Sequence, residues 1–98
     1  MTSDDVLGLL RENMDRIKSF GTSSVGIFGS FVQGNPSMAR DVDILVTFAE
    51  NKKTFDNYMG LKFFLESVLN SEKIDLVLAD SLKPGIREEV LRTVVYAA

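Results

Sequence analysis

Three aspartates are the residues best suited to chemistry in this chain. Asp41 and Asp43 open the apolar run 41–48, and Asp75 lies in the apolar run 73–79. Strand side chains alternate between two faces, so Asp41 and Asp43 share one face, and Asp75 joins them if the two strands are neighbours. Paired carboxylates repel each other, and a bound divalent cation would offset that repulsion. The spacing therefore predicts a Mg²⁺ site of the kind that two-metal phosphoryl chemistry requires.

A turn bounded by glycines precedes the first acidic run. It comprises Gly29, Ser30 and the residues up to Gly34, and we expect it to lead into the N-terminus of a short helix. Unpaired backbone N–H groups and the positive end of the helix dipole favour an anion such as a phosphate there. Ser30 adds a hydroxyl group. The sequence therefore predicts a phosphate site beside the carboxylates.

Composition limits the kinds of site that this chain can build. The chain has 98 residues, of which 45% are hydrophobic, and these values predict one domain over residues 1–98. It contains no cysteine and no histidine, which excludes Cys/His zinc sites and histidine acid/base catalysis. Oxygen atoms remain as the metal ligands.

Charge and hydropathy predict the classes of partner and the cellular location of the chain. Eleven Lys and Arg residues against 14 Asp and Glu give a net charge of −3, so a templating nucleic acid is not expected as a partner. No apolar run is long enough to span a bilayer, and the first residues lack the basic start of a secretion signal. We therefore expect no membrane partner and a cytoplasmic location.

Hydrophobic periodicity predicts the remaining elements. The expected helices cover residues 4–18 with Ser3 as N-cap, 54–69 and 84–94, and the expected strands cover residues 24–28, 42–48 and 74–79. The second helix is expected to face the core with the stripe Tyr58, Leu61, Leu65 and Val68, broadened by Phe55, Met59, Phe63 and Phe64, and the last helix with Ile86, Val90, Leu91 and Val94. The predicted fold is α/β, or α+β by another convention: a small mixed sheet with the acid-bearing strands central and helices mainly on one face.

These motifs together resemble a known group, the minimal nucleotidyltransferases of the DNA polymerase β superfamily. Their order and spacing match over nearly the whole chain, and the residues that carry the resemblance are Gly29, Ser30, Gly34, Asp41, Asp43 and Asp75. The resemblance implies a polymerase β-like palm core without fingers or thumb domains.

The resemblance also implies an activity. A nucleoside monophosphate, AMP from ATP or another NTP, would pass to a hydroxyl group with two Mg²⁺ ions held by Asp41, Asp43 and Asp75. Gly29 and Ser30 would hold the β- and γ-phosphates. Because 98 residues leave no room for a large acceptor-binding domain, we expect a partner to present the hydroxyl. In the resembling family that partner is a HEPN-type toxin, which implies a protein-AMPylating antitoxin.

Two positions depart from the pattern of the family. Members often carry Arg where this chain has Gln33, and Ser or Thr where it has Arg40. One cation near the phosphates is therefore lost, or its role has moved to Arg40, which we predict to contact the triphosphate.

Three other interpretations fit the same residues. The chain could be a non-catalytic antitoxin that covers the active surface of its toxin. It could be a small-molecule nucleotidyltransferase whose neighbouring subunits in a homo-oligomer form the acceptor pocket. The carboxylates could also form a purely structural cation site. The acid triad favours catalysis over the first interpretation, the short chain disfavours the second, and the adjoining Gly29-Ser30 turn disfavours the third.

Overall fold

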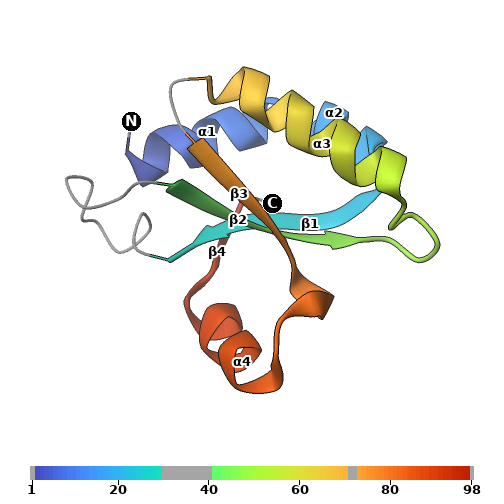
Figure 1. Ribbon diagram of the computed structural model, residues 1–98. Coiled ribbons are helices and arrows are strands. Elements are labelled where there is room, and N and C mark those ends of the chain that lie inside the picture. The colour runs from blue at the N-terminus through green and yellow to red at the C-terminus, as the bar shows by residue number, and fades with distance from the viewer. Residues whose placement is uncertain (1, 30–40, 71–72, 98) are drawn as a thin grey trace.

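A four-stranded mixed sheet forms the centre of the computed structural model, which describes residues 2–29, 41–70 and 73–97 (Figure 1). The strands are β1 (Thr22–Phe28), β2 (Asp41–Phe48), β3 (Lys73–Leu78) and β4 (Val95–Tyr96), and their spatial order is β3-β2-β1-β4. Strand β1 runs antiparallel to β2 and β4, whereas β2 and β3 are parallel. A parallel pair requires a crossover, which helix α3 (Phe55–Val68) provides. The predicted mixed α/β fold is confirmed.

The position of the acid-bearing strands differs in part from the prediction. Strands β2 and β3 are neighbours, as expected, but only β2 is internal and β3 lies at an edge of the sheet. The other edge is β4, which the sequence did not predict. Gly26 allows β4 to approach β1 closely, because a Cβ there would lie 2.8 Å from the Val95 carbonyl oxygen and 3.0 Å from the Tyr96 Cα.

The N-terminal segment forms two helices where one was predicted. Helix α1 (Ser3–Glu12) and helix α2 (Met14–Ser19) are separated by Asn13, whose side-chain amide donates a hydrogen bond of 2.8 Å to the Leu9 carbonyl. Asparagine side chains compete for backbone groups in this way and interrupt helices. The N-cap is Thr2, not the predicted Ser3: the Thr2 hydroxyl accepts from the Asp5 N–H, and the Asp5 carboxylate accepts from the Thr2 N–H.

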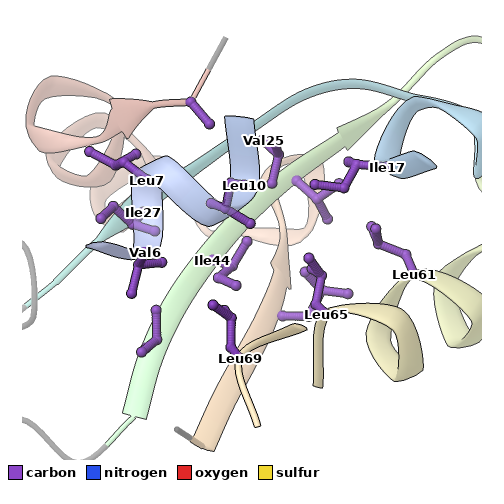
Figure 2. Close-up of a cluster of buried hydrophobic side chains, with 14 residues drawn as sticks. Val6, Leu7, Leu10, Ile17, Val25, Ile27, Ile44, Leu61, Leu65 and Leu69 are labelled. Atoms are coloured by element: carbon purple, nitrogen blue, oxygen red, sulfur yellow. The ribbon is translucent and has the colours of Figure 1, made fainter. Parts of the chain in front are cut away.

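Helices cover the two faces of the sheet unequally (Figure 1). Helices α1, α2 and α3 lie on one face, and helix α4 (Pro84–Thr93) lies on the other. The larger core fills the space under the first three helices (Figure 2), and its buried members include Val6, Leu10, Ile17, Val25, Ile27, Val42, Ile44, Val46, Leu61, Leu65, Leu69 and Leu76. A smaller cluster under α4 consists of Leu45, Ala79 and Val90.

Several residues predicted to face the core are exposed. On α3, Phe55 and Phe63 are 77% and 60% exposed. The buried stripe of this helix follows Leu61 and Leu65, and Phe63 lies about 200° around the helix from Leu61. On α4, Ile86 and Leu91 are 56% and 41% exposed. Helix α4 rests on the sheet through Val90 and the half-buried Val94, so its other apolar side chains remain open to solvent. No described helix has the length and apolar character needed to cross a membrane.

Tyr58 connects the helical layer to the edge strand that carries Asp75. Its hydroxyl donates a hydrogen bond of 2.9 Å to the carbonyl oxygen of Leu76, the residue after Asp75. A hydrogen bond of this kind contributes about 1 kcal/mol and restrains a strand that has no partner on its outer side among the described residues. Helix α3 thus helps to fix the position of Asp75.

The contrast between Leu65 and Phe63 predicts the behaviour of a matched pair of variants. Leu65→Ala removes a fully buried side chain and should lower the free energy of unfolding by about 2–5 kcal/mol. Phe63→Ala truncates an exposed side chain two positions earlier in α3. This variant should change the free energy of unfolding by no more than about 0.5 kcal/mol. Urea denaturation measures both values, and similar losses in the two variants would contradict this account of the buried stripe.

Candidate active site

The parallel register of β2 and β3 brings the three predicted aspartates to one face of the sheet. Asp43 lies directly opposite Asp75, and Asp41 lies two residues before Asp43 on β2. The alternate residues Val42 and Ile44 point into the larger core, so the carboxylates belong to the opposite face. That face also carries Leu45 and Ala79 and is the face covered by α4.

Asp43 is the most constrained of the three acids. It is half-buried, while Asp41 and Asp75 are exposed. Burial, followed by the negative charges of Asp75 and Asp41, raises the pKa of the Asp43 carboxyl above its ordinary value of 3.8. Burial and the neighbouring negative charges therefore both disfavour ionisation of Asp43.

The predicted glycine turn begins beside this carboxylate. Phe28 is the β1 partner of Asp43, and Gly29 follows it with a φ of +83°. A Cβ on Gly29 would lie 2.5 Å from Oδ2 of Asp43, so the backbone of the turn lies against the acid. The predicted phosphate-binding Ser30, the predicted triphosphate contact Arg40 and the short helix expected after the turn all lie outside the described residues.

The chemistry of this group of residues fits a hard divalent cation. All three side chains offer carboxylate oxygens, which Mg²⁺ prefers, and a cation would relieve the repulsion that acts on Asp43. In the described ranges 2–29, 41–70 and 73–97, no three acidic side chains lie close enough together to hold a metal ion. The strand register gives the three acids a shared face of the sheet.

The three predicted acids share one face of the sheet and Gly29 of the predicted turn lies beside them, but the contact between Gly29 and Asp43 was not predicted. The alternation of side chains was enough to place Asp41 and Asp43 together, and the parallel β2–β3 pair adds Asp75. The approach of Gly29 to Asp43 depends on the β1–β2 register, which was not predicted. The glycine in the turn was the only signal in the sequence, and it did not indicate which side chain the turn would face.

The raised pKa of Asp43 predicts how stability depends on pH. An acid whose pKa rises on folding binds its proton more tightly in the folded protein, so stability falls as pH rises upward from the ordinary value of 3.8. In a metal chelator, Asp43→Asn should raise the thermal midpoint at about pH 7, and the gain should shrink as the pH approaches about 3. Thermal melts across this range measure the effect.

Asp80→Asn is the control, because its effect on the thermal midpoint should have the opposite sign. A hydrogen bond from Lys53 lowers the pKa of Asp80, so this exposed acid contributes stability above 3.8 that is lost as pH falls. Asp80→Asn should therefore lower the midpoint slightly at neutral pH. A loss of stability in both variants at neutral pH would contradict the repulsion assigned to Asp43.

This chain is similar to known nucleotidyltransferases. Protein adenylyltransferase MntA of Thermococcus cleftensis is 37% identical over 97 residues, which cover 98% of this chain and 96% of that protein. A solved structure of a minimal nucleotidyltransferase has a TM-score of 0.72 and 32% sequence identity, and the match covers 97% of this chain and 95% of that one.

A more distant structure shares the fold. It is the MNT antitoxin in complex with the tri-AMPylated HEPN toxin of Shewanella oneidensis, with a TM-score of 0.64 and 19% identity over 94% of this chain and 71% of that chain. The family model described as polymerase beta, nucleotidyltransferase matches residues 17–97, which include the turn and all three acids. This chain therefore belongs to the polymerase beta nucleotidyltransferase family.

Proposed function

We propose that this protein transfers AMP from ATP to a hydroxyl group of a partner protein, and that the partner is a HEPN-type toxin which the transfer neutralises. The observation that carries the proposal is the shared face of Asp41, Asp43 and Asp75 beside the Gly29 turn. The 37% identical relative is a protein adenylyltransferase, which supports this acceptor class. We propose the cytoplasm, where ATP is available, as the place of the reaction.

In the proposed site the three acids hold the metal ions. Asp41 and Asp43 would bind the Mg²⁺ that accompanies the nucleotide and share a second Mg²⁺ with Asp75. When bound, such ions neutralise charge on the phosphates and lower the pKa of a nearby hydroxyl. Burial, followed by the charges of Asp75 and Asp41, raises the pKa of Asp43, and this supports the assignment because a bound cation would favour the ionised carboxylate.

The transfer itself is a substitution at phosphorus. The acceptor oxygen attacks the α-phosphate of ATP, a new P–O bond forms, and the bond between the α-phosphate and the β-phosphate breaks. Pyrophosphate leaves, and the Asp75 carboxylate would accept the proton that the attacking hydroxyl loses. Gly29 and Ser30 would hold the β- and γ-phosphates so that the leaving group lies in line with the attacking oxygen.

The placement of the acids determines the side from which the acceptor approaches. They lie on the face of the sheet that α4 covers, while α1, α2 and α3 cover the other face (Figure 1). The acceptor hydroxyl must therefore reach the sheet beside α4. The Shewanella oneidensis structure, in which an MNT antitoxin accompanies a tri-AMPylated HEPN toxin, supports a protein acceptor of this kind.

An assay of the partner tests the proposal directly. Incubation of the co-purified partner with Mg²⁺ and ATP should increase its mass by one or more AMP units, and Asp75→Asn should reduce the rate by at least about 100-fold. Asp80→Asn removes a nearby acid that lies in the helical turn Ala79–Ser81 and should leave the rate unchanged. Toxin inhibition without any mass increase would instead support the non-catalytic antitoxin.

Arg40 gives a second, independent prediction. If its guanidinium contacts the triphosphate, Arg40→Ala should weaken ATP binding about tenfold, the value of one charge-assisted hydrogen bond. Calorimetric titration with Mg²⁺ and a non-hydrolysable ATP analogue measures this change. Arg87→Ala in α4 serves as the control cation. Equal affinities in the wild type and Arg40→Ala would remove Arg40 from the site.

A further inference from the structure

We infer that Gly29 is a positioning residue for Asp43: it keeps the carboxylate aligned with Asp41 and Asp75 because it has no side chain. This steric role is separate from the phosphate contact suggested above, and its importance for catalysis rests on the proposed function. It predicts that a methyl group at position 29 would act through Asp43 before any nucleotide is bound.

Two features of the structure meet at Gly29. Its φ of +83° is a conformation that residues with a side chain rarely adopt. Independently, a Cβ would lie 2.5 Å from Oδ2 and 3.4 Å from Cγ of Asp43. The first distance is far below van der Waals contact, so either the carboxylate or the backbone would have to move.

The sheet restrains the backbone of Asp43. Asp43 lies on the internal strand β2, paired with Phe28 of β1 on one side and with Asp75 of β3 on the other. Ladders on both sides restrain its backbone, and the adjacent Val42 and Ile44 are fully buried. The Asp43 backbone is therefore held in the sheet, and rotation of its side chain would relieve the contact by moving Oδ2 from its present position on the face shared with Asp41 and Asp75.

A double-mutant cycle in a metal chelator separates this contact from backbone strain. Gly29→Ala is combined with Asp43→Ala, which removes the carboxylate, and with Asp43→Asn, which keeps an atom in the position of Oδ2. Gly29→Ala should raise the equilibrium constant of unfolding in both the wild type and the Asp43→Ala background. The factor should be at least fivefold smaller, ~1 kcal/mol, in the Asp43→Ala background. In the Asp43→Asn background the effect should equal that in the wild type.

Gly21 provides the matched control. Its φ is +92°, and a Cβ there would lie 2.6 Å from Cβ of Lys52, away from the acids. Gly21→Ala should destabilise the protein equally in the wild-type and Asp43→Ala backgrounds. If Gly29→Ala alone does not fold, recovery of folding in Gly29→Ala/Asp43→Ala supports the contact, and failure to recover overturns it.

The cycle is independent of enzymatic activity, so its failure can be distinguished from failure of the proposed function. Equal effects of Gly29→Ala in the wild-type and Asp43→Ala backgrounds would show that backbone conformation alone requires the glycine, and would overturn the inference even if AMP transfer is observed. In a second readout, titration with Mn²⁺ alone should show weaker binding to Gly29→Ala than to Gly21→Ala. Equal Mn²⁺ affinities would remove the positioning role.

Discussion

Repulsion between carboxylates on neighbouring strands is the interaction on which this site depends. The parallel register of β2 and β3 places Asp43 opposite Asp75, and strand alternation adds Asp41 on the same face. Three negative charges on one sheet surface oppose folding unless something positive joins them. In the protein alone, burial of Asp43 together with the charges of Asp75 and Asp41 raises the pKa of its carboxyl, and an affinity for a divalent cation is the consequence that we propose for the working protein.

The rest of the fold can be understood as support for this unfavourable arrangement. On the opposite face, Val42, Ile44 and Leu76 are buried under α1, α2 and α3, so the same strands that carry the acids also carry the core. Burial of these side chains offsets the repulsion, since each contributes about 1.5–3 kcal/mol. The hydrogen bond from Tyr58 to the Leu76 carbonyl restrains the edge strand beside Asp75.

Local patterns were enough to predict most of the elements and the acids, because alternation and helical spacing are properties of neighbouring residues. Several properties that depend on distant partners were not predicted, although the pairing of the two acid-bearing strands was. The approach of β4 to Gly26, the edge position of β3 and the exposure of Ile86 all follow from how segments far apart in sequence pack. The interruption at Asn13 is local, but a side chain that bonds its own helix leaves no distinct periodic signal.

The most direct test of the metal–nucleotide site is the thermal midpoint of the wild type and of Asp43→Asn with Mg²⁺ alone, with ATP alone and with both. A ligand that binds only the folded state stabilises it by about 2.7 kcal/mol at one hundred times its Kd. We expect a rise in the midpoint that needs Mg²⁺ and ATP together and that disappears in Asp43→Asn. A wild-type protein that shows no rise under any of these conditions, with and without its partner, would contradict it.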